Sequence, residues 1–238
     1  MRVSGESEMK VRFIAEIGMN HNGNHDLIPA LIKSAAESGA DYAKFQVGWR
    51  EGVNEINNLS DETLENIIRL CGFYGVQPLF STITDRAFDR VSKLGLRTIK
   101  VASRTVKYEP GLVRRIVDYA DEAIISLGMW DGDDVPLNSS NIKYLFCISK
   151  YPAYPWDLSG FPSSFGEHDR YYGYSDHTVG VEACLIAIAR GARIIEKHFT
   201  LDKSDTTIRD HALSASPSEF RTLVTLGQTM SKTLSGLV

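Results

Sequence analysis

The segment YYGYSDHTVGVEACLIAIARGARIIEKHF, residues 171–199, contains a complete strand–helix–strand unit. Short apolar runs at 171–175 and 192–199 flank a stretch of helical period at 180–191, as expected of two strands joined through a helix. Strands connected in this way pair in parallel through a right-handed crossover. The unit therefore predicts an α/β fold with a parallel sheet.

The same alternation extends through the rest of the chain. Six further apolar runs precede this unit, at 11–18, 41–47, 76–82, 97–103, 122–128 and 143–149, each rich in β-branched or aromatic residues. Further helical stretches are expected at 25–39, 60–75, 85–95, 109–120 and 216–234. Eight strands within 238 residues fit a small (β/α)8 TIM barrel, with residues 1–238 as a single domain. A doubly wound open sheet is the alternative, but the glycine pattern G-x-G-x-x-G follows none of the strands.

Capping residues and loop composition predict where the helices of this barrel begin and end. Asp26 and Ser60 are expected to be helix N-caps, and Gly39, Gly75, Gly95 and Gly191 to end helices in the left-handed conformation,. The crossovers at 129–142 and 150–169 contain Pro, Gly, Asp and Ser without helical period,. We therefore expect shortened connections, either loops or a single helical turn, around the fifth to seventh strands.

Composition excludes several classes of protein. The net charge is -4, with 26 basic and 30 acidic residues and no long basic run, which disfavours binding to nucleic acid or to an anionic membrane. No stretch reaches the roughly 18 apolar residues of a membrane helix, and the N-terminal segment MRVSGESEMK is too polar for a signal peptide,. Three widely spaced cysteines lie in apolar surroundings, as expected of reduced thiols: Cys71, Cys147 and Cys184. We therefore expect a cytoplasmic protein.

Polar side chains collect where the expected strands end. In a parallel barrel these ends meet on one face, where active sites are built. Burial of so many polar groups without a function would be costly. The sequence therefore predicts a polar site at this face, drawn from Glu16, Asn20, Lys44, Gln46, Ser81, Thr82, Lys100, Ser103, Ser126, Ser149, Tyr151, Ser175, His177, Glu196, Lys197 and His198.

Two histidines end neighbouring strands. His177 and His198 can share a divalent cation, but two imidazoles do not make a zinc site. A mixture of imidazole, water and substrate oxygens suits Mn²⁺, Co²⁺ or Mg²⁺ better. The alternative is that one or both are hydrogen-bonded histidines that fill the top of the barrel.

Three lysines lie in or at the ends of apolar strands. Lys44, Lys100 and Lys197 would form an anion-binding set, completed by the hydroxyl groups of Thr82, Ser103 and Ser149. Alternatively, they extend outward and keep their ammonium groups in water. Lys44 or Lys197 could also be the Schiff-base nucleophile of a barrel aldolase.

Three segments together resemble the sialic acid synthase (N-acetylneuraminate synthase) family. They are FIAEIGMNHNGNHDLIPALIKSAAESGADYAKFQ at 13–46, FSTITDRAFDRVSKLGLRTIKVAS at 80–103 and YGYSDHTVGVEACLIAIARGARIIEKHFTLDK at 172–203. Within the last segment, GYSDHT and EKHFTLDK are highly specific. The resemblance implies a TIM barrel that condenses phosphoenolpyruvate with an aldehyde sugar such as N-acetylmannosamine. The products would be phosphate and a nine-carbon 2-keto acid.

The resemblance also implies roles for individual residues. His177 and His198 would hold a divalent metal, usually Mn²⁺, with Mg²⁺ or Co²⁺ as alternatives, and Glu16 would be the acid/base group. Glu16 and Asp210 would stand near the sugar. The implied contacts to phosphoenolpyruvate come from Lys44, Thr82, Lys100, Ser103, Ser149, Tyr151 and Ser175, and Asn20, Gln46 and Lys197 complete the expected substrate-binding set.

Some positions depart from the family pattern. The family reads K-I-x-S-x-E after the fourth strand, whereas KVASRT has Thr105 in place of the acidic residue that faces the substrate. The loop after the second strand is shortened to WREGVNEINNL, and the family's GPDH motif becomes Ile208-Arg209-Asp210-His211. We also expect the family's C-terminal antifreeze-like domain, which covers the partner's site in a dimer, to be absent.

Three hypotheses for the function follow. The first is a metal-dependent synthase that joins phosphoenolpyruvate to an aldose, working as a homodimer by resemblance. The second is a non-catalytic barrel that binds phosphoenolpyruvate or phosphate as a partner subunit or sensor. The third is a lysine-dependent barrel aldolase.

Overall fold

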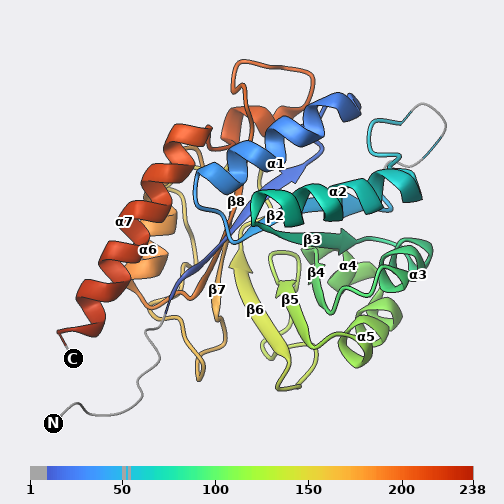
Figure 1. Cartoon of the computed structure of the whole chain (residues 1–238). Coiled ribbons are helices and arrows are strands. Elements are labelled where there is room, and N and C mark those ends of the chain that lie inside the picture. Colours follow the sequence, from blue (N-terminus) through green and yellow to red (C-terminus); the bar gives the residue numbers. More distant parts are fainter. Residues whose placement is uncertain (1–9, 50–51, 53–54, 238) are drawn as a thin grey trace, which may run out of the picture.

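The computed structural model describes residues 10–49, 52 and 55–237, and its eight strands close into a barrel (Figure 1). They follow one another around the barrel in chain order, and each pairs in parallel with the next. The strands are β1 (Arg12–Gly18), β2 (Tyr42–Val47), β3 (Gln77–Thr82), β4 (Thr98–Val101), β5 (Glu122–Ser126), β6 (Ile142–Cys147), β7 (Gly173–Asp176) and β8 (Ile194–His198). The expected TIM barrel is confirmed, and the doubly wound open sheet is excluded.

Helices surround this barrel on the outside (Figure 1). Six of them match the expected helical stretches: α1 (Ile28–Glu37), α2 (Asp61–Tyr74), α3 (Asp85–Lys93), α5 (Pro110–Tyr119), α6 (Glu182–Ala189) and α7 (Pro217–Ser235). The first residues of the expected stretch at 25–39 form a short 3-10 helix, η1 (His25–Leu27). The sequence did not indicate α4 (Ser103–Tyr108) or the 3-10 helix η2 (Arg209–Leu213), because both are too short for a helical period to show in the sequence.

Helix ends largely follow the expected signals. The Ser60 side chain caps α2 by accepting a hydrogen bond from the Thr63 N–H, and Gly75 ends the same helix at a φ of 73°. Gly39, Gly95 and Gly191 also have positive φ. The expectation that Asp26 is an N-cap is wrong, because the Asn24 side chain instead accepts from the Asp26 N–H and starts η1. An asparagine readily forms this turn with the backbone two residues on.

The connections on either side of β6 are irregular. Residues 127–141 and 148–172, all of them described, form no helix, which confirms the expected shortened crossovers. The expected shortened loop after β2 lies partly outside the described residues, as does the polar N-terminal segment. No helix in the described part of the chain is both long and apolar enough to cross a membrane.

Alternating side chains fill the barrel interior in layers. At the N-terminal end of the strands, Arg12 Nη1 and Nη2 lie 2.6 and 2.8 Å from the carboxylate oxygens of Glu122, across the barrel. Above this pair is an apolar layer of Ile14, Leu79, Ile124, Leu145 and Ile194. Because strand side chains alternate between faces, the residues two positions further along point toward the C-terminal mouth: Glu16, Ser81, Ser126, Cys147 and Glu196.

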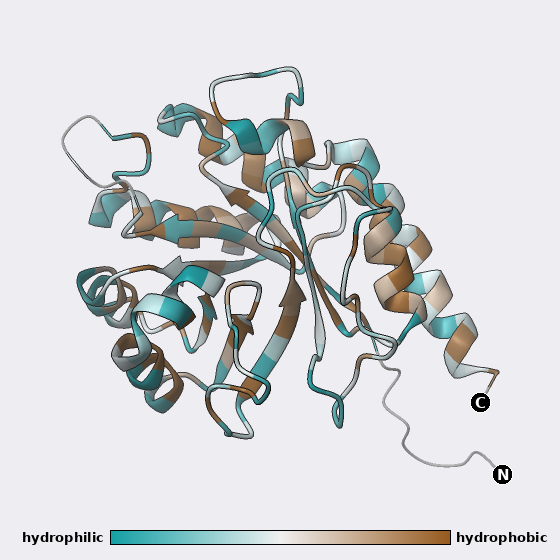
Figure 2. Cartoon of the chain, turned by 180° about the vertical axis from the view of Figure 1, so that it is seen from behind, coloured by the Kyte–Doolittle hydropathy of each residue, from teal (hydrophilic) through white to brown (hydrophobic). Residues whose placement is uncertain are grey.

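A second, larger core lies between the strands and the helices. Strand residues that point outward, such as Phe13, Phe45 and Phe80, are fully buried there. Figure 2 shows the corresponding pattern, in which apolar colour runs along the strands while polar colour marks much of the helix surface. Cys71, Cys147 and Cys184 are buried free thiols, as expected.

Candidate active site

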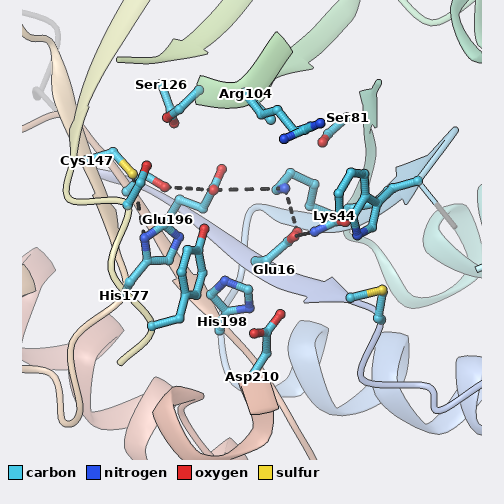
Figure 3. Close-up of a pocket in the computed structure, with 18 of the residues that line it drawn as sticks. Glu16, Lys44, Ser81, Arg104, Ser126, Cys147, His177, Glu196, His198 and Asp210 are labelled. Atoms are coloured by element: carbon cyan, nitrogen blue, oxygen red, sulfur yellow. Dashed lines mark hydrogen bonds and ion pairs between the residues drawn. The ribbon is translucent and has the colours of Figure 1, made fainter. Parts of the chain in front are cut away.

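A polar pocket of about 680 Å³ opens at the C-terminal mouth of the barrel. Every strand contributes to it, either through its last inward-facing residue or through the loop that follows (Figure 3). The pocket lies directly above the apolar layer of the interior, which closes its base. Its position is that of active sites in TIM barrels generally.

Lysines and glutamates form the floor of this pocket. Lys44 Nζ lies 2.6 Å from Glu16 Oε2 and 3.9 Å from Glu196 Oε1, while Lys100 Nζ lies 3.6 Å from Glu196 Oε2. All four side chains are buried. Burial alone would raise the pKa of Glu196, but Lys100 and Lys44 outweigh it and lower this pKa to about 2. Glu196 is therefore a fixed negative charge between two lysines.

The two floor lysines differ in how firmly they hold their protons. Burial lowers the pKa of Lys44, but Glu16 and Glu196 outweigh burial, so that the pKa is raised overall. For Lys100 burial prevails over the attraction of Glu196, and the pKa is lowered. Lys100 donates a hydrogen bond to Ser126 Oγ at 2.8 Å. Lys44 is thus a permanent cation, whereas Lys100 gives up its proton more readily.

Hydroxyl groups surround the lysines. Ser175 donates to Glu196 Oε1 at 2.9 Å, and Ser103 Oγ accepts from the Gly128 N–H at 3.0 Å. Ser81 and Ser149 also line the pocket. Together with two ammonium groups, these donors form a suitable environment for a phosphate or a carboxylate.

His177 and His198 lie side by side, with their ring centroids 5.4 Å apart. His177 Nδ1 is 2.8 Å from the Ile148 carbonyl oxygen, which leaves Nε2 as the nitrogen available to a ligand. His198 Nδ1 is buried without a hydrogen-bond partner. No group of three or more His, Cys, Asp or Glu residues within the described chain is placed to hold a metal ion. A cation held by these two imidazoles would need its other ligands from water or substrate.

A thiol lies behind His177. Cys147 Sγ is 3.6 Å from His177 Nδ1. Burial would raise the pKa of this thiol, but His177 and Lys100 outweigh burial and lower it. Burial would likewise lower the pKa of His177, and Cys147 and the Ile148 carbonyl raise it to about 9. The thiol lies near Nδ1, on the side of the ring opposite to Nε2.

Two carboxylates complete the pocket near the histidines (Figure 3). Gln46 Nε2 donates to Glu16 Oε1 at 2.8 Å, which fixes the glutamate beside Lys44. Asp210, on η2, has a buried oxygen, Oδ1, without a hydrogen-bond partner. Arg209 Nε lies 3.5 Å from this oxygen, and the Arg209 guanidinium lies over the Tyr151 ring at 4.7 Å.

The structure brings together eleven of the fourteen residues to which the sequence assigned a catalytic, metal-binding or substrate-binding role. In the pocket lining are Glu16, Lys44, Gln46, Lys100, Ser103, Ser149, Tyr151, Ser175, His177, His198 and Asp210. Asn20, Thr82 and Lys197 do not line the pocket. Thr82 is next to the inward-facing Ser81, so strand alternation turns its side chain to the outer face,.

Lys197 and Asn20 have structural partners instead. Lys197 Nζ lies 2.8 Å from Asp176 Oδ2 and also donates to the Thr178 carbonyl, and both ionic side chains are fully buried. Tyr174, Cys184 and the Thr178 N–H also donate to Asp176. Asn20 Nδ2 donates to the Phe199 carbonyl and to Ser214 Oγ, both at 2.9 Å. These contacts stabilise the structure next to the pocket, outside its lining.

Ser81, Ser126 and Glu196 were expected at this face without an individual role, and they also line the pocket. Arg104 and Cys147 line it as well and were not expected there. Ser81, Ser126, Cys147 and Glu196 each lie two residues beyond a member of the apolar interior layer, so strand alternation places them in the pocket once the inward face of each strand is known. Arg104 belongs to α4, which the sequence did not indicate.

Comparison with known proteins identifies similar chains. A model of the NeuB family matches residues 51–237. The sequence is 33% identical to an uncharacterized protein of Methanocaldococcus jannaschii, covering 89% of this chain and 68% of that protein. It is 31% identical to N,N'-diacetyllegionaminic acid synthase of Legionella pneumophila, covering 92% of this chain and 71% of that enzyme. The fold superimposes on N-acetylneuraminic acid (sialic acid) synthetase of Leptospira borgpetersenii with a TM-score of 0.81 and 26% identity, covering 98% and 90% of the two chains.

Proposed function

The chain belongs to the NeuB family, and from this premise we propose that it condenses phosphoenolpyruvate with an aldose. The products would be a sialic-acid-like 2-keto sugar acid and phosphate, with N-acetylmannosamine or a related sugar as the acceptor. One observation carries the proposal: a single pocket combines a lysine-lined floor with two adjacent imidazoles and a buried glutamate. The synthase names of two similar proteins support the same class of reaction.

The floor would bind phosphoenolpyruvate. Its phosphate and carboxylate would accept hydrogen bonds from Lys44, Lys100 and the surrounding serines, since charge-assisted hydrogen bonds of this kind are strong. Glu196 forms ion pairs with both lysines. The bound enolpyruvate would thus be kept close to the apolar base of the pocket, away from bulk water.

His177 and His198 would hold a divalent cation at the acceptor side of the pocket. We propose Mn²⁺, with Mg²⁺ and Co²⁺ as alternatives. Such a cation, when bound, would polarise the aldehyde oxygen of the acceptor. The hydrogen bond between His177 Nδ1 and the Ile148 carbonyl fixes the ring so that Nε2 stays available,.

Glu16 is the proposed acid/base group. C3 of the enolpyruvate would attack the aldehyde carbon, water would add at C2, and the resulting intermediate would lose phosphate. Glu16 lies between Lys44 and Gln46, where it can hold or release a proton during these steps. Asp210 and Tyr151 would line the sugar side.

Release of phosphate tests the proposed reaction. The chain would be incubated with phosphoenolpyruvate, Mn²⁺ and a panel of aldoses, with and without a separately supplied antifreeze-like domain. Phosphate should appear only when both substrates are present, and Glu16→Gln should lower kcat by about 100-fold. Glu65→Gln, in the exposed part of α2 away from the pocket, is the matched control. If no aldose gives phosphate under either condition, the synthase proposal fails and the non-catalytic binding barrel takes its place.

Metal binding is a separate prediction. His177→Ala and His198→Ala should each weaken Mn²⁺ binding at least about tenfold, since each removes one of two protein ligands. His168→Ala changes an exposed histidine outside the pocket and should have no effect. Electron paramagnetic resonance of free Mn²⁺ gives the affinity without any need for turnover. Unchanged binding in a His177→Ala/His198→Ala double variant would remove the metal from the proposal.

The aldolase alternative now depends on a different lysine. Lys197 lies outside the pocket, and Lys44 is held in its charged form by two glutamates. Lys100 combines a lowered pKa with a place in the pocket, which is what a Schiff-base lysine requires. Borohydride reduction in the presence of pyruvate should leave a covalent adduct on Lys100 if the chain is an aldolase, and none if it is a synthase.

A further inference from the structure

Arg104 differs from the other charged residues of the pocket. Each carboxylate in the lining has a cationic neighbour: Glu16 has Lys44, Glu196 has both lysines, and Asp210 has Arg209. Among the residues that the structure describes, none forms an ion pair with Arg104. Of the lysines and arginines that line the pocket, Arg104 is therefore the one without an ionic partner among the described residues.

Two aromatic rings hold the Arg104 guanidinium. Its carbon lies 5.3 Å from the centroid of the Trp49 ring and 4.8 Å from that of Tyr108. Stacking on rings orients a guanidinium while leaving its N–H donors free for an oxyanion. In Figure 3 the side chain points into the pocket on the same side as Ser81, with His177, His198 and Asp210 on the other side. The donors are thus presented to whatever occupies the pocket.

Arg104 lies where it would contact the end of an acceptor that is remote from the aldehyde. It follows β4, whereas His198 ends β8, on the opposite side of the closed barrel. An acceptor whose aldehyde lies at the imidazoles would cross the pocket above the floor lysines and reach the wall that carries Arg104 and Trp49. Phosphoenolpyruvate would lie below, where Lys44 and Lys100 are already available to its charges.

The described residues of this wall include no carboxylate in the pocket lining. Thr105 stands where the family pattern has an acidic residue, and it is buried, outside the pocket lining, with no hydrogen-bond partner for its hydroxyl. Arg104 would therefore face the acceptor with no carboxylate from the described part of this wall to repel an anion. A neutral sugar would leave this charge unused, whereas an anionic group would pair with it.

We propose that Arg104, held by Trp49 and Tyr108, selects an acceptor aldose that carries a phosphate or carboxylate group at the end remote from its aldehyde. This inference rests on the proposed condensation for its orientation of the acceptor. It adds a residue that determines specificity and a chemical class for the acceptor.

The test compares neutral and anionic acceptors of the same skeleton. The probes are N-acetylmannosamine, its 6-phosphate and the corresponding 6-carboxylate, each measured by phosphate release from phosphoenolpyruvate and, without phosphoenolpyruvate, by calorimetric binding. The variants are Arg104→Gln, Arg104→Lys and, as control, Arg114→Gln on the exposed face of α5.

The wild type should favour at least one anionic acceptor by about 10- to 100-fold in kcat/KM and in affinity. Arg104→Gln should abolish this preference, Arg104→Lys should keep part of it, and Arg114→Gln should keep all of it. The KM for phosphoenolpyruvate should not change. Preference for the phosphate or for the carboxylate then identifies the anion.

Several results would overturn the inference. If the wild type binds the neutral sugar with the same affinity as both anionic sugars, the pocket has no anion subsite. If the preference for an anionic sugar survives in Arg104→Gln, it comes from the floor lysines. A raised KM for phosphoenolpyruvate in Arg104→Gln would assign Arg104 to that substrate instead. Absence of phosphate release with every acceptor contradicts the condensation, while the binding measurements still decide whether Arg104 recognises an anion.

Discussion

At the scale of single residues, a shift of one position along a strand changes the role of a side chain. Glu196 faces the pocket between two lysines, whereas Lys197 faces the helices and pairs with Asp176. Ser81 and Thr82 divide in the same way. Both members of each pair are buried and polar, so composition cannot separate them, but the alternation of strand side chains does.

The Asp176–Lys197 pair leads to a prediction about stability. Both charges are fully buried, so Lys197→Met, which leaves Asp176 charged and unpaired, should cost about 3–5 kcal/mol of unfolding free energy. The Asp176→Leu/Lys197→Met double variant should cost less than the sum of the single changes. Urea denaturation gives these values.

An exposed ion pair provides the control for this prediction. Lys150 Nζ lies 2.8 Å from Asp157 Oδ2, and both side chains are more than half exposed. Lys150→Met should therefore cost only about 0–1 kcal/mol. Equal losses for Lys197→Met and Lys150→Met would mean that the buried pair has no special structural role.

At the scale of elements, the short strand β7 depends on a glycine. A Cβ atom on Gly173 would lie 2.1 Å from the Ile194 carbonyl oxygen of the neighbouring β8. This backbone oxygen takes part in the barrel and cannot move without disturbing both strands. His177 directly follows β7, and His198 is the last residue of β8, so the strands that approach closely at Gly173 also carry the two imidazoles.

Gly173→Ala should accordingly destabilise the fold by about 3 kcal/mol or more. Gly111→Ala is the matched change, because nothing lies within 4 Å of a Cβ at that position of α5. Alanine is the better helix former there and should add about 0.5–1 kcal/mol. Thermal unfolding of both variants tests the prediction. A Gly173→Ala protein as stable as the wild type would show that the β8 backbone can shift to accommodate the added Cβ atom at little cost.

At the scale of the whole molecule, stability should fall on mild acidification. His21 is fully buried, and its Nδ1 accepts a hydrogen bond from the Gly23 N–H. Burial lowers the pKa of His21 to about 4, despite the opposing hydrogen bond with Asn57. Between pH 6.5 and 4 the unfolded chain therefore binds a proton that the folded chain does not.

The loss of stability attributable to His21 over this interval is roughly 2–3 kcal/mol. His21→Gln should flatten the decline of unfolding free energy between pH 6.5 and 4, whereas His168→Gln, at an exposed position, should leave it unchanged. Glu196 contributes in a lower range, since its pKa of about 2 is below its ordinary value and its stabilisation is lost only below about pH 4.5. Urea denaturation at a series of pH values separates the two, and an unaltered slope in His21→Gln would contradict the assignment.

The sequence by itself determined the eight strands, six of the helices and the face on which the polar groups gather. These features depend on local periodicity and on the rule that parallel strand ends meet at one edge. It also assigned individual roles to eleven residues of the pocket, including both histidines.

Only the tertiary structure decided which face of each strand turns inward and which charges pair. Thr82 and Lys197 were expected among the substrate-binding residues but do not line the pocket, because the inward face of a strand is fixed by the register of its neighbours when the barrel closes, and not by its own residues,. The charge balance that leaves Arg104 without a described ionic partner depends on distances between β1, β2, β4 and β8. Such distances are set by closure of the barrel, which no local pattern in the sequence contains.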